Sequence, residues 1–355
     1  MLSPLSALER LVRCESPTDD LEACNEVVSL AAAIAEEVLG IPAKIVQIQG
    51  RPVFWWGAQN PAVVLLGHLD TVWPKGSFEP VWSVEGDVIR GPGVFDMKAG
   101  YIQALYSLKG ISGSVALVAT TDEETGSATS RELIEELSRN STAVLVLEAS
   151  LDGKVKIGRK GTAMYQISAH GRAAHAGLEP EKGINSSVEI AHLILKLEAL
   201  ENSEHGTTVV PTMIRSGNTT NTVPDLAVLD IDARSYSQAD LIRVDAAIRS
   251  LATAHPDARF EIGGGLNRPP LEPSSTKELF EIAQRVANEM SFTIEGVAVG
   301  GASDGNFAAA TGARVLDGMG AIGAGAHAQN EWASVKGLDE RSAFLKRFVQ
   351  EILND

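Results

Sequence analysis

Three continuous apolar segments in this chain are each followed at once by acidic residues or histidine. The segments are Ala62–Asp70 (AVVLLGHLD), Ser114–Glu124 (SVALVATTDEE) and Thr142–Ser150 (TAVLVLEAS). An uninterrupted apolar run of this length is typical of a strand buried on both faces of a parallel sheet. Helical patterns at Met97–Leu108 and Thr129–Ser138 separate the three segments. This alternation predicts an α/β fold with a mostly parallel sheet flanked by helices.

The middle of the chain has a different order of elements. Met164–Gly171 alternates like a half-exposed strand, and Asn185–Leu200 has helical spacing. Two strands, a helix and a last strand follow, which completes the β-α-β-β-α-β order of a ferredoxin-like sandwich. A proline-rich segment, NRPPLEPS, then leads back to α/β alternation. We therefore predict a discontinuous catalytic domain, 1–158 and 267–355, with an inserted lid or dimerisation domain at 159–266.

Composition excludes several classes of protein. The chain has 355 residues, a net charge of −16 and no Lys/Arg cluster, so we expect no nucleic-acid partner. No apolar run reaches the roughly 18–20 residues needed to span a bilayer, and the N-terminus lacks a signal-peptide pattern. We expect a cytoplasmic protein without membrane attachment. Cys14 and Cys24 are too few for a four-ligand zinc site and are expected to be free thiols.

Polar residues at the ends of the apolar segments are the candidates for chemistry. His68 and Asp70 lie two positions apart at a strand end, so their side chains share one face. A metal ligand oriented by an acid has this pattern, and so does a buried His–Asp pair without metal. Asp96 lies between a glycine-rich turn and a helix start, where an aspartate can be a ligand or an N-cap.

Further acids and a second histidine strengthen the metal interpretation. Glu123 and Glu124 end one apolar strand, Glu148 follows another, and His327 lies in a glycine-rich loop. Open α/β sheets place their ligand sites at such strand ends, and buried acids need a cation to neutralise them. Histidine with carboxylate ligation suits zinc, with cobalt or manganese as substitutes. Two metals would share a bridging carboxylate and leave one acid as the base for water.

The same segments carry a family resemblance. The motifs GHLDTV, GPGVFDMKAG, TTDEETGS, VLEAS, GRAAHAG, GGASDGNF and GAGAH occur in this order. The chain resembles the dizinc aminoacylase/carboxypeptidase metallopeptidases, most closely their glutamate carboxypeptidase (carboxypeptidase G type) branch. The resemblance spans nearly the whole chain, including the inserted domain.

The resemblance implies two zinc ions per subunit and a role for each candidate ligand. His68, Asp96 and Glu148 would hold one zinc ion. Asp96, Glu124 and His327 would hold the other, with Asp96 as the bridging ligand.

The resemblance also implies the groups that act beside the metals. Glu123 would be the general base and later the general acid, and Asp70 would orient the first histidine ligand. The peptide bond between Asp96 and Met97 would be cis. His175 of the partner subunit would stabilise the oxyanion, which implies a homodimer formed through the inserted domain.

Three further residues are candidates for substrate binding. Asn221 matches a polar residue that reaches the same partner site. Arg234 would receive the substrate carboxylate; the alternative is a surface arginine paired with Asp232 or Asp230. Ser303 lies in a glycine-rich turn that opens a helix, where backbone N–H groups suit a carboxylate.

These observations predict a dizinc hydrolase of small peptides or N-acyl amino acids. We expect a carboxypeptidase that releases a C-terminal residue such as glutamate. An N-acyl-amino-acid deacylase of amino-acid metabolism is the alternative, because Glu148, in place of aspartate, fits both branches. A non-catalytic binding protein on the same fold is disfavoured, since all five ligand positions and Glu123 are intact. A nucleotide site is disfavoured too, because GPGVFD and GGGLNR lack the required glycine spacing.

Overall fold

The computed structural model describes residues 2–354 and divides into two compact units. Among the described residues, the first unit comprises 2–158, 273–299 and 303–354, and the inserted unit comprises Arg159–Glu272 and Gly300–Ala302. The backbone N–H groups of Arg159 and Leu271 each donate to the other's carbonyl oxygen, which ties the returning segment to the entering one.

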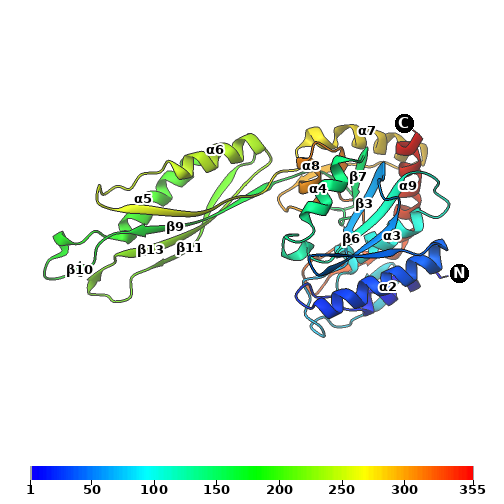
Figure 1. Ribbon diagram of the computed structural model, residues 1–355, viewed down its shortest axis with the longest axis horizontal. Coiled ribbons are helices and arrows are strands. Elements are labelled where there is room, and N and C mark those ends of the chain that lie inside the picture. The colour runs from blue at the N-terminus through cyan, green and yellow to red at the C-terminus, as the bar shows by residue number, and fades with distance from the viewer. Residues whose placement is uncertain (1, 355) are drawn as a thin grey trace. The chain divides into compact units, whose positions relative to one another are not determined.

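The main sheet of the first unit has six strands among the described residues (Figure 1), in the order β1-β2-β6-β3-β7-β16. Strands β3, β6, β7 and β16 run parallel, whereas β1 and β2 are antiparallel additions at one edge. Every residue of β3, β6 and β7 is buried, as the apolar runs predict. The strand bounds are Lys44–Ile48 (β1), Arg51–Gly57 (β2), Val63–His68 (β3), Val115–Thr120 (β6), Ala143–Val146 (β7) and Val315–Leu316 (β16).

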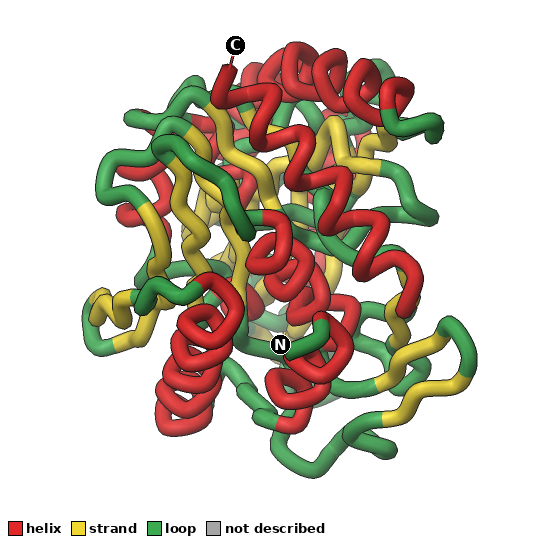
Figure 2. Tube along the Cα trace, turned by 90° about the vertical axis from the view of Figure 1, so that its right-hand side faces the viewer, coloured by secondary structure: helices red, strands yellow, loops and turns green. Residues whose placement is uncertain are grey.

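Helices lie across the strands of this sheet (Figure 2), and their apolar faces complete one core. Helix α2 illustrates how the sequence sets the bounds, because Asp20 accepts a capping hydrogen bond and Gly40 ends the helix with a φ of 71°. The helices are Pro4–Arg13 (α1), Leu21–Leu39 (α2), Ala99–Ser107 (α3), Arg131–Arg139 (α4), Pro273–Glu289 (α7), Asp304–Ala310 (α8) and Val335–Asn354 (α9). The predicted α/β class is thus confirmed.

Short elements connect the sheet to the loops that carry the candidate residues. Helix α3 begins two residues later than predicted, because Asp96 and Met97 have non-helical dihedral angles within a preceding turn. That turn is a π-helical turn, η1 (Val94–Lys98), and a 3-10 turn, η2 (Glu123–Thr125), follows β6. The remaining strands of this unit are Ser83–Glu85 (β4), Val88–Arg90 (β5), Gly323–Ala324 (β17), Trp332–Ser334 (β18), Gly296–Val299 (β15) and β8 (Val155–Arg159), which runs into the insertion.

The inserted unit contains an antiparallel sheet whose four described strands have the order β11-β13-β9-β14. Alternate residues of β13 are buried, and they pack with both helices in a separate core. This is the β-α-β-β-α-β order that the sequence predicts. Its elements are Gly161–His170 (β9), Ala174–His175 (β10), Pro180–Lys182 (η3), Ser186–Leu197 (α5), Glu198–Leu200 (η4), Thr208–Ser216 (β11), Thr222–Val223 (β12), Leu226–Ser235 (β13), Gln238–Arg249 (α6) and Arg259–Arg268 (β14). Within residues 2–354, no helix combines the length and the apolarity needed to cross a bilayer.

Candidate metal centre

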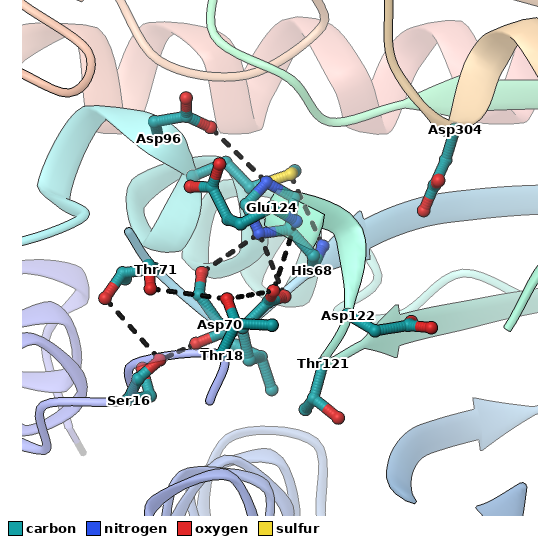
Figure 3. Close-up of polar contacts among 12 residues, drawn as sticks. Ser16, Thr18, His68, Asp70, Thr71, Asp96, Thr121, Asp122, Glu124 and Asp304 are labelled. Atoms are coloured by element: carbon teal, nitrogen blue, oxygen red, sulfur yellow. Dashed lines mark hydrogen bonds and ion pairs between the residues drawn. The ribbon is translucent and has the colours of Figure 1, made fainter. Parts of the chain in front are cut away.

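Five side chains from the ends of the main-sheet strands and from two loops meet in the first unit. His68 ends β3, Asp96 lies in η1, Glu124 lies in η2 after β6, Glu148 follows β7, and His327 lies between β17 and β18. They form two groups whose ligand atoms lie within 4.8 Å of one another, and Asp96 belongs to both groups. Figure 3 shows Asp96 and Glu124 beside the imidazole of His68. The structure thus assembles the predicted ligands into two triads with one shared member.

The two carboxylate oxygens of Asp96 face different histidines. Oδ1 lies 3.3 Å from His68 Nε2, and Oδ2 lies 3.3 Å from His327 Nε2. His68 Nε2 is also 3.6 Å from Glu148 Oε1, and His327 Nε2 is 3.1 Å from Glu124 Oε2. Ligands placed tetrahedrally around a zinc ion at its usual bond lengths lie about 3.3–3.4 Å apart. These separations therefore match the donor spacing of a carboxylate-bridged pair of metal sites.

Unsatisfied buried atoms in the cluster give an independent test of whether a metal fits. His68 Nε2 and Asp96 Oδ1 are both buried, and neither makes a hydrogen bond of acceptable geometry within the described residues. Buried polar atoms nearly always have a hydrogen-bond partner, so two neighbouring buried atoms without one require an explanation. Nitrogen and carboxylate oxygen are the donors that zinc and similar dications prefer. The residues present fit a dinuclear metal site.

Without a metal ion, protonated histidines offset the negative charges of the carboxylates in this cluster. Burial opposes ionisation of Asp96, but the favourable interactions with the nearby imidazoles of His327 and His68 outweigh it and hold the pKa of Asp96 below its usual range. Burial also opposes charge on His68, yet the carboxylates around it, Asp70 first, raise its pKa well above the usual value. Hydrogen bonds to Asp96 and Glu124 raise the pKa of His327 to about 10. Metal cations that bind here must release these protons.

Asp70 positions groups in both triads. The Nδ1 atom of His68 lies 3.0 Å from the backbone oxygen of Asp70 and 3.4 Å from its Oδ1, which directs Nε2 toward the cluster. Oδ2 of Asp70 accepts hydrogen bonds from the hydroxyl of Thr18 and from the backbone N–H of Glu124 (Figure 3). A fully buried carboxylate with these contacts fixes the orientation of the imidazole.

Glu331 is a functional candidate that sequence reasoning missed. Its side chain is 0% exposed and accepts hydrogen bonds from the backbone N–H groups of Gly93, Phe95 and Asp96 and from the indole of Trp73, at 2.9–3.2 Å. Burial raises the pKa of Glu331, while these hydrogen bonds oppose the shift. The peptide bond from Asp96 to Met97 is cis, as the resemblance implies. Glu331 therefore holds the turn that carries the carboxylate shared by the two triads.

Substituting Glu331 with glutamine is expected to weaken metal binding roughly 10- to 100-fold, the usual cost of losing a partner behind a ligand. The amide keeps one acceptor oxygen but turns its own N–H groups toward backbone donors. Competition titration with a chromogenic chelator measures the affinity. Glu85→Gln, at an exposed position of β4, is the matched control. Equal affinities in both variants would show that Glu331 does not position Asp96.

Glu123 and His175 lie on different units. Glu123 directly precedes Glu124 in η2 and is partly exposed. His175 is exposed on β10 of the inserted unit, where its Nδ1 accepts hydrogen bonds from the N–H groups of Gly177 and Leu178. In the neutral ring this places the proton on Nε2, so the imidazole offers an N–H donor. The backbone oxygen of Asn221 accepts from Ala176, which brings that candidate beside His175.

The other two candidates make contacts that serve the fold. Arg234 forms a two-point ion pair with Asp232, with distances of 2.8 and 3.0 Å, and Nη1 donates to Gly300 O. This is one of the pairings that the sequence left open. Ser303 is fully buried, caps α8, and donates its hydroxyl to Asp317. Its N–H donates to Asn306, so both groups of Ser303 are engaged in the helix cap.

Comparisons with known proteins agree with this architecture. The chain is 29% identical to carboxypeptidase G2 of Pseudomonas sp. (strain RS-16), over 98% of this chain and 89% of that protein. It is 24% identical to succinyl-diaminopimelate desuccinylase of Thioalkalivibrio sulfidiphilus, over 99% and 100% of the two chains. The fold matches the M20 family metallo-carboxypeptidase Sso-CP2 of Sulfolobus solfataricus with a TM-score of 0.74, at 17% identity and complete coverage of both chains.

A tripeptidase of Staphylococcus aureus has the same fold, with a TM-score of 0.79 at 20% identity over 99% of this chain and 98% of that one. Residues 64–351 match the sequence profile of peptidase family M20/M25/M40. This match covers most of the chain and both triads, and it confirms the resemblance on which the ligand assignment rests. The chain therefore belongs to peptidase family M20/M25/M40 and is a hydrolase of the metallopeptidase and amidohydrolase type.

Proposed function

We propose that the protein is a dizinc carboxypeptidase that cleaves the amide bond next to a free carboxylate and releases a C-terminal residue such as glutamate. The observation that carries the proposal is the shared carboxylate of Asp96, which faces one histidine of each triad at 3.3 Å. Similarity to carboxypeptidase G2 over 98% of the chain supports the carboxypeptidase assignment.

The protein's own residues supply the proton transfers. Two bound dications would provide Lewis-acid polarisation and lower the pKa of water. Glu123 takes a proton from the attacking water while the oxygen of that water bonds to the carbonyl carbon of the substrate. The same carboxyl then delivers that proton to the amide nitrogen as the C–N bond breaks, which yields a carboxylic acid and an amine. The second proton of the water then passes from the acid to the amine, so the products are a carboxylate and an ammonium ion. His68, Asp96, Glu124, Glu148 and His327 are proposed as the metal ligands, in agreement with their geometry.

A deacylase is the second candidate, because the chain is 24% identical to a succinyl-diaminopimelate desuccinylase over nearly its full length. Both candidate substrates carry a free carboxylate, and Arg234 is the proposed residue that binds it. That role requires the guanidinium to exchange part of its ion pair with Asp232 for the substrate. We keep Ser303 as a weaker proposal, since its polar groups already cap a helix.

A substrate panel decides between the two candidates. It comprises dipeptides that end in glutamate, N-acyl glutamates, other N-acyl amino acids and N-succinyl diamino acids, each with zinc, cobalt or manganese and with a chelator. We expect metal-dependent release of glutamate to be the fastest reaction. Faster hydrolysis of the N-acyl compounds would support the deacylase. Tight binding of two metals without turnover of any compound would refute both substrate assignments and leave the metal site intact.

We also propose that the active protein is a homodimer in which His175 and Asn221 complete the partner's site. Strand β11 supports this proposal, because it lies at an edge of the inserted sheet and exposes the apolar residues Met213 and Ile214. A free edge strand with exposed apolar side chains is suited to pair with a second copy. The Nε2–H donor of His175 suits an oxyanion.

Mixing two inactive variants tests this arrangement. His175→Ala and Glu123→Gln are unfolded together, refolded and assayed, and each is expected to be inactive alone. If His175 acts across the dimer, each mixed dimer has one complete site, so about one quarter of wild-type activity should return with random pairing. Sedimentation confirms that dimers form. No recovered activity from a mixture of well-formed dimers would place His175 in its own subunit's site, and activity of His175→Ala alone would place it outside the site.

A further inference from the structure

A second cavity lies in the first unit, and none of the five candidate metal ligands lines it. Its volume is about 640 Å³, which is within the range of roughly 300–1,000 Å³ typical of small-molecule sites. The walls come from the segment after α7, the first half of α9, the turn before β8 and the residue before β17. Its apolar lining residues are Met290, Phe292, Ile294, Ile322, Ala343 and Phe344.

The side chain of Arg341 also lines this cavity, and it is 5% exposed. One guanidinium nitrogen, Nη2, donates to the backbone oxygen of Gly153. The other, Nη1, is buried and has no hydrogen-bond partner among residues 2–354. Burial lowers the pKa of Arg341 to about 10, and the charge of Glu340, which forms no ion pair with Arg341 in the described part of the chain, opposes this shift. A buried charge with one neutral acceptor is costly to maintain in an apolar wall.

The charged residues at the rim restrict what the cavity can accept. Lys154 and Glu295 pair with each other at 2.5 Å, so their charges cancel locally. The other charged lining residues, Asp152 and Glu340, are exposed acids. A ligand with two negative charges would therefore place the second charge beside apolar walls or these acids. A single carboxylate satisfies the guanidinium without that cost, because the two groups form charge-assisted hydrogen bonds.

We propose that this cavity is a second binding site, which takes a small monocarboxylate with an apolar body and pairs its carboxylate with Arg341. The apolar body lies against the aromatic and aliphatic walls. Two sources share this chemistry: a simple organic acid and an apolar amino acid, whose ammonium group can face the acids of the rim. The site is independent of the proposed substrate, because every residue in the argument lies outside the metal centre.

Calorimetric titration of the metal-loaded protein tests the proposal. The probes are 3-phenylpropionate, L-phenylalanine and, as the uncharged control, 3-phenylpropanamide. We expect at least one of the two carboxylates to bind and the amide to bind about tenfold or more weakly, as loss of a charge-assisted hydrogen bond predicts. Binding of 3-phenylpropionate alone would identify a site for organic acids. Stronger binding of L-phenylalanine would identify a site for amino acids.

Two substitutions locate the bound probe. Arg341→Met keeps an unbranched apolar stem and removes the guanidinium, and Ala343→Glu places a carboxylate at an exposed helical position of the lining. Both are expected to weaken binding about tenfold or more, whereas Ala343→Gln, the matched control, should leave binding within about twofold. A carboxylate bound at the metal centre would be unaffected by all three. Equal binding in wild type and Ala343→Glu, or no binding of either carboxylate to wild type, would overturn the proposal.

Discussion

Replacing Glu123 by glutamine is expected to lower kcat by about 10²- to 10⁴-fold, the range that a positioned general base contributes. Glutamine has nearly the same size but cannot accept the proton from water or return it to the leaving amine. Metal content should stay at two ions per chain, because Glu123 belongs to neither ligand triad. Steady-state kinetics on the best compound of the panel, with elemental analysis of the same sample, measures both quantities.

Glu132→Gln is the matched control for this experiment, since Glu132 is exposed on the neighbouring helix α4. It should retain wild-type kcat and metal content. A Glu123→Gln enzyme with kcat within about tenfold of wild type would remove this residue from the proton transfers. Loss of metal in that variant would instead assign Glu123 to the ligands.

Asp96→Asn is expected to reduce the metal content from two ions toward zero and to abolish turnover. The shared carboxylate offers one oxygen to each triad, whereas an asparagine offers one oxygen and an NH₂ group that cannot bind a cation. The loss of affinity should exceed the roughly 10- to 100-fold expected for Glu331→Gln, because a ligand itself is removed. Elemental analysis after dialysis against limiting metal measures the stoichiometry.

His327→Gln is the comparison that separates the two sites. His327 belongs to one triad only, so this variant should retain one ion held by His68, Asp96 and Glu148. Two ions retained by Asp96→Asn would contradict the bridging role. Equal losses in both variants would show that the two sites fill only together.

Much of the candidate centre could be predicted from the sequence, because several of its proposed ligands follow strands that are easy to recognise. The segments before His68 and Glu148 are apolar throughout, as expected of strands buried on both faces of the sheet. Parallel strands place their carboxyl ends at the same edge of the sheet, so residues that follow these strands lie close together. Neither Asp96 nor His327 ends such a run. They were assigned through the family resemblance, because loops have no periodic pattern from which their position follows.

The contacts that sequence reasoning missed join residues far apart in the chain. Glu331 accepts from N–H groups 235–238 positions earlier, and no local pattern shows which of many glutamates becomes buried. Arg341 presents the same difficulty, since its cavity forms only when α9 packs beside the segment after α7. Arg234 is the opposite case, because Asp232 lies two positions away on the same face of β13 and the pairing could be weighed in advance.

Metal binding at the proposed ligands would also stabilise the folded chain. Asp96 and His327 belong to the same triad and lie 231 positions apart in the sequence, yet their side chains approach to 3.3 Å. A cation held by both would be a removable cross-link, and closing a loop of this length in an unfolded chain costs about 5 kcal/mol of conformational entropy. If the proposed sites are filled in the folded protein, metal-free molecules should therefore lose stability as well as activity, and they should unfold more readily.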